Sequence, residues 1–185
     1  MKGKSKKDQI GIRVAGFGGQ GVILSAKIVG KAVAIYEDKD SSVMQSYGPE
    51  ARGSACSGSV VISDSRVGYP YVTKPDILIA LSKDGYAKYR SSLKEDGILI
   101  IEEDLVELDK RDKGKNVFSI PATKLAEELG KKIVANIVML GYFTKVTDVA
   151  SYDSMKKSVL ETVPDKFREL NEKAFDRGYS YGRKE

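Results

Sequence analysis

The fold is decided by the stretch IGIRVAGFGGQG, residues 10–21. Residues 10–15 are mainly small or β-branched and end at Gly16, which predicts a first strand. Gly16, Gly18 and Gly21 then satisfy the spacing G-x-G-x-x-G, and apolar residues recur at helical spacing over residues 22–36. The stretch therefore predicts a strand, a glycine-rich turn and a buried helix in succession.

The rest of the chain continues this alternation. Further strands are predicted over residues 42–47, 57–63, 75–81, 97–101 and 116–120, and further helices after Ser82 and over residues 121–129, 133–146, 151–163 and 165–178. This order predicts an α/β fold, a three-layer α/β/α sandwich with a largely parallel central sheet. A chain of 185 residues fits one such domain, which we expect over residues 10–185, after a flexible basic leader at residues 1–9.

The composition excludes several kinds of chemistry. There are no histidines and one cysteine, Cys56. Zinc sites with nitrogen and sulfur ligands, iron–sulfur clusters and catalysis by an imidazole are therefore not expected, and we predict no metal site and no catalytic residue in this chain. An intrachain disulfide is impossible, which fits a reducing cytoplasm. Cys56 is expected to be a small buried apolar residue rather than a reactive thiol.

The charge is concentrated at the start of the chain. The net charge is +5, and the first eight residues, MKGKSKKD, hold four lysines and one aspartate. The remainder carries little excess of basic residues, so a nucleic-acid surface is not expected. The leader is not followed by the apolar region of a signal peptide, and no run approaches the length of a membrane-spanning helix. We expect a cytoplasmic protein without a membrane partner.

The glycine turn favours an anion. Glycines let the backbone approach a ligand closely, and the free N–H groups at a helix start attract negative charge, so Gly18, Gly19, Gln20 and Gly21 are candidate binding residues. Three interpretations stay open: a dinucleotide site, tight packing without a ligand, and the docking of an anion or a partner.

The dinucleotide interpretation is disfavoured by the order of the elements. In that fold an acidic residue after the second strand binds the ribose. Here Glu37 and Asp38 precede the predicted second strand, and the first acidic residue after it is Glu50.

A second cluster, YGPEARG at residues 47–53, leaves the carboxyl end of the second predicted strand. Ligands bind at this edge in open α/β sheets, so both glycine segments are expected on one rim. Arg52 offers a planar fork for a carboxylate or phosphate, or it pairs with Glu50. We predict a loop that contacts a partner or ligand, with these candidate residues: Tyr47, Gly48, Pro49, Glu50, Arg52 and Gly53.

A third segment, Tyr69-Pro70-Tyr71-Val72, lies in a turn-rich stretch. It is a candidate for part of an apolar face that a partner covers. The alternative is an edge strand folded onto the sheet.

Three motifs in order resemble a known family. GFGGQG at residues 16–21, QSYGPEARG at 45–53 and NIVMLG at 136–141 are similar to the gamma subunit of 2-oxoacid:ferredoxin (acceptor) oxidoreductases, and the likeness runs from about Ile10 to Val163. The form of residues 47–53 is closer to the 2-oxoglutarate and branched-chain types than to the pyruvate type.

The resemblance implies a fold like the gamma domain of pyruvate:ferredoxin oxidoreductase and a role in a complex. Such a complex decarboxylates a 2-oxoacid oxidatively, joins the acyl group to coenzyme A and passes electrons to ferredoxin or a similar acceptor. Thiamine diphosphate and Mg belong to the alpha and beta subunits, and the iron–sulfur clusters to other chains such as a ferredoxin-like delta subunit.

For this chain the resemblance implies no cofactor of its own and no activity alone. Its expected role is to complete the complex and the approach of coenzyme A, with residues 18–21 at the rim and 2-oxoglutarate as the favoured substrate. The alternatives are an NAD(P)- or FAD-binding oxidoreductase and a small anion-binding regulatory module.

Overall fold

The structure is a computed structural model that describes residues 9–46, 55–112 and 116–182. Its centre is a six-stranded sheet in the order β2-β3-β1-β4-β5-β6. The strands are β1 (Gln9–Phe17), β2 (Asp40–Ser46), β3 (Ala55–Ser63), β4 (Ile77–Ala80), β5 (Ile98–Glu102) and β6 (Val117–Ile120). The pairs β1–β4, β4–β5 and β5–β6 are parallel, whereas β3 is antiparallel to both β1 and β2. Five of the six strands therefore run in one direction, which confirms the largely parallel sheet.

The helices are α1 (Val22–Tyr36), α2 (Lys83–Tyr89), α3 (Ala122–Glu128), α4 (Ala135–Val146), α5 (Tyr152–Thr162) and α6 (Arg168–Ser180). Short 3-10 turns lie at Arg90–Ser92, Lys110–Asp112, Lys132–Val134 and Asp165–Phe167. None of the described helices is both long and apolar enough to cross a membrane.

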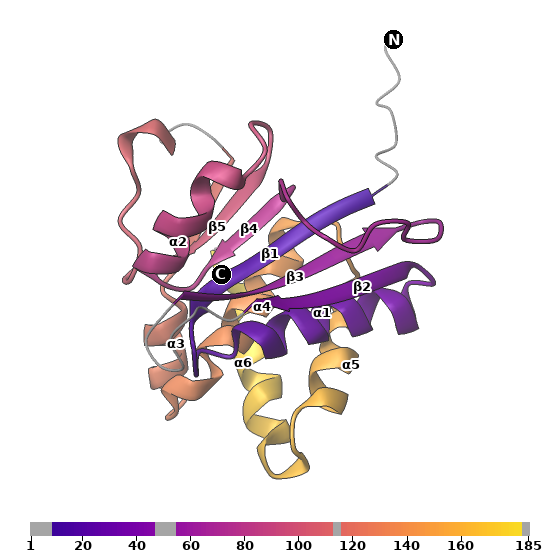
Figure 1. Ribbon diagram of the computed structural model, residues 1–185. Coiled ribbons are helices and arrows are strands. Elements are labelled where there is room, and N and C mark those ends of the chain that lie inside the picture. Colours follow the sequence, from indigo (N-terminus) through magenta and orange to yellow (C-terminus); the bar gives the residue numbers. More distant parts are fainter. Residues whose placement is uncertain (1–8, 47–54, 113–115, 183–185) are drawn as a thin grey trace.

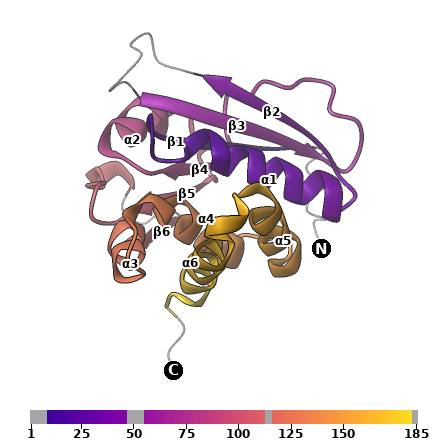
Figure 2. The same ribbon diagram turned by 90° about the horizontal axis from the view of Figure 1, so that it is seen from below.

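The helices form two unequal layers. Figures 1 and 2 show α1 and α3 to α6 together on one side of the sheet, with α2 on the other. The main apolar core includes Ile12 and Val14 of β1 and the helices of the larger layer. Ala15 points the other way and packs with Tyr86 of α2 in a smaller cluster. This alternation along β1 follows from the two-residue period of a strand and confirms the three-layer sandwich.

The larger layer depends on close contact between α4 and α6. A Cβ atom added at Gly178 of α6 would lie 2.7 Å from the carbonyl carbon of Val138 in α4. A Cβ atom at Gly141 would lie 2.8 Å from the backbone nitrogen of Tyr179. The two glycines let the helix backbones approach each other more closely than any side chain would allow.

The sheet register places the ends of β1 and β2 at one edge. Phe17, the last residue of β1, is opposite Ala55, and Ser46, the last residue of β2, is opposite Ser57. β1 leads into α1 on one face, whereas β4 leads into α2 on the other, so the connection changes sides between these adjacent strands. Open α/β sheets bind their ligands in the crevice at such a point.

Most predicted elements agree with the structure within two or three residues. α1 has the predicted limits, and Ser82 caps α2 as predicted, because its Oγ accepts a hydrogen bond of 3.1 Å from the Gly85 N–H. The helix predicted from residue 133 begins as a 3-10 turn and becomes α-helical at Ala135. The edge-strand alternative for Tyr69-Pro70-Tyr71-Val72 is wrong, because the segment belongs to no strand and both tyrosines are more than half exposed.

Candidate functional site

The glycine turn is fixed by the side chain of Gln20. Its Oε1 accepts a hydrogen bond of 2.7 Å from the Phe17 N–H, and its Nε2 donates one of 3.1 Å to the Leu81 carbonyl. The first bond closes the turn on itself and the second ties it to the end of β4. Gln20 therefore braces the turn, and the exposed backbone of Gly18 and Gly19 forms its outer surface.

Positive φ angles explain two of the glycines. Gly19 has φ +92°, and Gly21, the residue that precedes α1, has φ +72°. A Cβ atom at Gly19 would meet nothing within 4 Å, whereas one at Gly21 would lie 2.7 Å from Cγ of Asn136. Only Gly21 is therefore needed both for its backbone angle and for space.

Asn136 joins the starts of two helices. This residue of α4 is 4% exposed, and its Nδ2 lies 3.5 Å from the Gly21 carbonyl and 3.4 Å from Ser25 Oγ in α1. Ser25 Oγ in turn donates a bond of 2.9 Å to the same carbonyl. Neither α1 nor α4 has a side-chain cap at its start. The N-terminal ends of both helices therefore meet with backbone N–H groups unpaired within the helices.

A cavity of about 330 Å³ opens beside this junction. It is lined by Gly19, Gln20, Leu81, Glu102, Ala122, Thr123, Lys132, Ile133, Ala135 and Asn136. Some of these residues directly follow β1, β4 or β6, and others end β5 or begin α4. The cavity therefore lies at the switch point of the sheet. We call it the edge cavity.

Glu102 is a buried carboxylate in the wall of the edge cavity, with 2% exposure. Its oxygens accept hydrogen bonds from the Leu105 N–H at 2.9 Å and from the Thr123 N–H at 3.0 Å. The side chain therefore caps the start of α3 from a neighbouring strand. Sequence analysis missed Glu102, although an acidic residue directly after the predicted strand 97–101 was a usable signal.

The edge cavity is suited to binding rather than to chemistry. Two helix starts and the Lys132 side chain supply positive potential, while Leu81 and Ile133 supply apolar surface. The carboxylate of Glu102 is held by two backbone donors, and among the residues that the structure describes no group of three or more acidic or cysteine side chains could hold a metal ion. A ligand with an anionic part and an apolar part fits these surroundings.

The other predicted binding residues fall outside the described part. Tyr47, Gly48, Pro49, Glu50, Arg52 and Gly53 all lie in residues 47–54, whose flanking residues Ser46 and Ala55 lie at the same sheet edge as the glycine turn. Their predicted contacts remain predictions.

The structure agrees with the prediction for Cys56. Cys56 is buried, as predicted, and burial raises the pKa of its thiol.

Glu37 and Asp38 lie just before β2, whose first residue, Asp40, is opposite Ser63 at the edge where β1 begins. The 15-residue α1 separates them from the glycine turn by about 20 Å. They cannot bind the ribose of a dinucleotide held at that turn.

The fold and the glycine turn agree with a family comparison. Residues 11–181 match the model of the family described as pyruvate ferredoxin/flavodoxin oxidoreductase. The chain therefore belongs to this family, and the family resemblance predicted from the three motifs is confirmed.

Three individual proteins are similar to this chain over about nine-tenths of its length. The 2-oxoglutarate synthase subunit KorC of Methanocaldococcus jannaschii is 48% identical over 170 residues, which cover 91% of each chain. The KorC subunit of Methanothermobacter thermautotrophicus is 43% identical over 173 residues, 90% of this chain and 92% of the relative. The crystal structure of the gamma subunit of a keto/oxoacid ferredoxin oxidoreductase from Geobacter sulfurreducens superposes with a TM-score of 0.84 at 40% identity and covers 93% of this chain and 95% of that one.

Proposed function

We propose that this chain is the gamma subunit of a 2-oxoglutarate:ferredoxin oxidoreductase and that its edge cavity receives the anionic part of coenzyme A. Its high identity to the KorC subunits over nearly their whole length supports the choice of 2-oxoglutarate. Alpha and beta subunits would hold thiamine diphosphate and Mg, and a ferredoxin-like delta subunit would carry iron–sulfur clusters. The chain then serves a cytoplasmic complex as a structural and coenzyme A-positioning part.

The observation that carries the proposal is the placement of the edge cavity. It lies at the switch point of the sheet, where the braced glycine turn, the starts of α1 and α4 and the side chain of Lys132 converge. Such a site favours phosphate groups, and its one carboxylate, Glu102, is held by the backbone N–H groups of Leu105 and Thr123. The pantetheine arm of coenzyme A would extend from this rim to the companion subunits, where the acyl group forms.

Two pairs of variants test the proposal in the reconstituted complex. The first pair is Gly19→Ala and Gly182→Ala. Both glycines have positive φ and open space around them, so alanine imposes the same kind of strain, but only Gly19 lines the edge cavity. The KM for coenzyme A is expected to rise for Gly19→Ala and to stay unchanged for Gly182→Ala.

The second pair is Lys132→Gln and Lys27→Gln. Lys132 lines the edge cavity, whereas Lys27 is an exposed residue of α1 that does not. Loss of one exposed charge contact is worth up to about 1 kcal/mol, or roughly a fivefold rise in KM for coenzyme A. Equal KM values for both members of each pair would contradict the assignment of the edge cavity to coenzyme A.

A further inference from the structure

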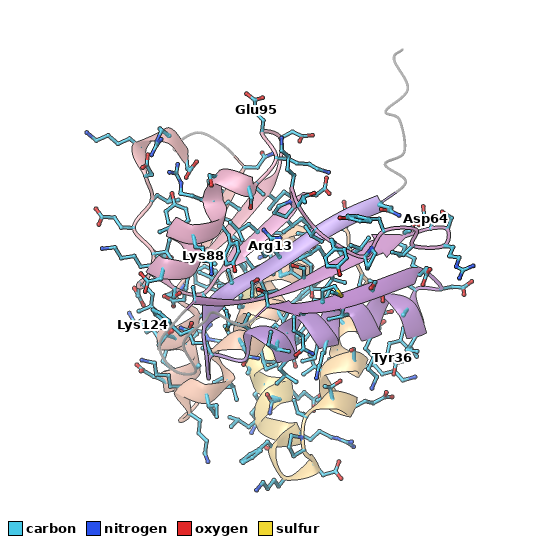
Figure 3. The ribbon with its side chains drawn as sticks, in the orientation of Figure 1. Arg13, Tyr36, Asp64, Lys88, Glu95 and Lys124 are labelled. Atoms are coloured by element: carbon cyan, nitrogen blue, oxygen red, sulfur yellow. The ribbon has the colours of Figure 1, made fainter. Side chains whose placement is uncertain are left out.

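A second surface lies on the face of the sheet opposite α1. Arg13 of β1 is opposite Ser59 of β3, which is opposite Met44 of β2, and these side chains share this face. Together with Tyr71 and Tyr89 they line an open pocket of about 410 Å³. The full lining is Arg13, Met44, Gln45, Ser46, Ser57, Ser59, Tyr69, Tyr71, Val72, Thr73 and Tyr89, which we call the Arg13 face. Figure 3 labels Arg13 on the ribbon of β1 and Lys88 on α2.

Arg13 carries a charge that no carboxylate of the described residues balances. Its Nε donates to Ser59 Oγ at 3.4 Å, its Nη1 to Ser92 Oγ at 3.2 Å and its Nη2 to the Val72 carbonyl. These contacts use three of the five N–H groups of the guanidinium, so two are left. Within the described ranges no acidic side chain forms an ion pair with it.

A nearby arginine shows the contrast. Arg90 forms ion pairs with Asp112 at 2.9 Å and with Asp109 at 3.5 Å, and hydrogen bonding to Asp112 raises its pKa. For half-buried Arg13 the pKa moves the other way, because desolvation is the largest influence and no carboxylate offsets it. The guanidinium remains charged near neutral pH, so the described residues compensate its burial incompletely.

Aromatic side chains surround this charge. The Tyr89 ring lies 4.9 Å from the Arg13 guanidinium and 5.3 Å from the Lys88 ammonium. Tyr69 and Tyr71 are 58% and 56% exposed, and their ring centres lie 5.4 Å apart at the rim of the pocket. Tyrosine and arginine are enriched among the residues that dominate protein interfaces.

We propose that the Arg13 face binds a carboxylate-bearing segment of a companion subunit. An aspartate or glutamate of that subunit would accept hydrogen bonds from the two remaining N–H groups of the Arg13 guanidinium. Apolar groups beside this carboxylate would cover Tyr69 and Tyr71. Among the described residues that line the pocket, Arg13 is the only one whose side chain carries a charge near neutral pH, so charge complementarity selects an acidic partner. This inference rests on the proposed function, since it requires companion subunits, but it concerns a surface separate from the edge cavity.

The first test measures association with the alpha and beta subunits. Arg13→Gln removes the fork, and Arg66→Gln removes the same charge from an exposed loop residue as a control. The dissociation constant is expected to rise at least tenfold for Arg13→Gln, as for a lost buried charge pair, and to change less than twofold for Arg66→Gln. Equal constants for the two variants would overturn the inference while the proposed function stands. Failure of the wild-type chain to bind would overturn both.

The second test leaves Arg13 intact and so does not depend on the folding of its variant. Tyr71→p-benzoylphenylalanine is irradiated in the assembled complex, and the cross-linked peptide is identified by mass spectrometry. We expect a peptide of a companion subunit that contains Asp or Glu. Cross-links confined to this chain, or to a second copy of it, would overturn the inference.

Discussion

The two faces of the central sheet are built for different purposes. On the α1 side, Ile12 and Val14 are completely buried, and the helices that cover them approach so closely that Gly141 and Gly178 are required. On the α2 side, one short helix covers part of the sheet, and the Arg13 face stays open. The first face stabilises the fold, while the second leaves hydrogen-bonding capacity and aromatic surface for another molecule.

This difference shows how a small chain can serve a larger assembly. The edge cavity lies where the two faces meet, and its polar side chains Gln20, Glu102 and Asn136 are all used in internal hydrogen bonds. Its rigidity therefore comes from the chain itself, whereas we propose that a partner completes the Arg13 face. Substitutions on the two faces should separate these contributions by their effects on stability.

The largest effect is expected for Gly178→Ala. The added methyl group would force the backbones of α4 and α6 apart, because the carbonyl carbon of Val138 would lie 2.7 Å away. We expect a loss of about 4 kcal/mol in the free energy of unfolding, above the usual range for overpacking because two helix backbones must separate. Gly68→Ala is the control, since a Cβ atom there meets nothing within 4 Å. Urea unfolding that gives equal values for both variants would contradict the close packing of these helices.

The comparison of the faces is tested most simply by two neighbours in β1. Ile12→Ala removes completely buried methyl groups and should cost about 3 kcal/mol. Arg13→Gln, one residue further on the opposite face, should change the stability of the isolated chain by less than about 1 kcal/mol, because three hydrogen bonds are exchanged for relief of an unbalanced charge. Thermal unfolding of the isolated chains measures both. A larger loss for Arg13→Gln would show that this residue is structural.

A smaller effect is expected at the junction of α1 and α4. Gly21→Ala should cost about 2 kcal/mol, because it combines left-handed backbone strain with a collision against Asn136. An Asn136→Ala background removes the collision with the amide group and leaves the strain and a Cβ contact of 3.2 Å, so the cost should fall to about 1 kcal/mol. A double-mutant cycle by urea unfolding measures this coupling. Additive effects would mean that the two residues are not in contact.

The smallest effect concerns Glu37 and depends on pH. Its carboxylate accepts a hydrogen bond of 2.8 Å from the Ser151 N–H, and hydrogen bonds from Ser154 and Ser151 lower its pKa. A lowered pKa in the folded state stabilises the fold above the unfolded pKa near 4.5, and this contribution is lost as the pH falls through the folded value. Glu37→Gln should therefore cost no more than about 0.5 kcal/mol at pH 7, and melting curves should show the gap narrowing below pH 4.5. A gap that widens in acid would contradict this sign.

Much of the fold could be predicted from local sequence signals. The glycine turn, the limits of α1, the Ser82 cap and the burial of Cys56 all depend on residues close together in the chain. The reversed direction of β3 and its insertion between β1 and β2 could not be predicted, because they depend on pairing across the chain that no short pattern records.

The candidate site was only partly predictable for the same reason. The sequence predicts the turn and makes Gln20 a candidate binding residue, but it does not predict the hydrogen bonds of its side chain to Phe17 and Leu81. Glu102 and Lys132 reach the edge cavity from distant segments, and the hydrogen bonds of Arg13 to Ser59 and Ser92 depend on the tertiary fold rather than on any motif.

The most direct measurement is a reconstitution with and without this chain. The assay measures the 2-oxoglutarate-dependent reduction of an electron acceptor in three samples. The first contains the companion subunits that bind thiamine diphosphate, the second contains these subunits and this chain, and the third contains this chain alone. We predict coenzyme A-dependent turnover only in the complete mixture and none from the isolated chain. Turnover by the isolated chain, or full coenzyme A-dependent activity without it, would contradict a coenzyme A-positioning role.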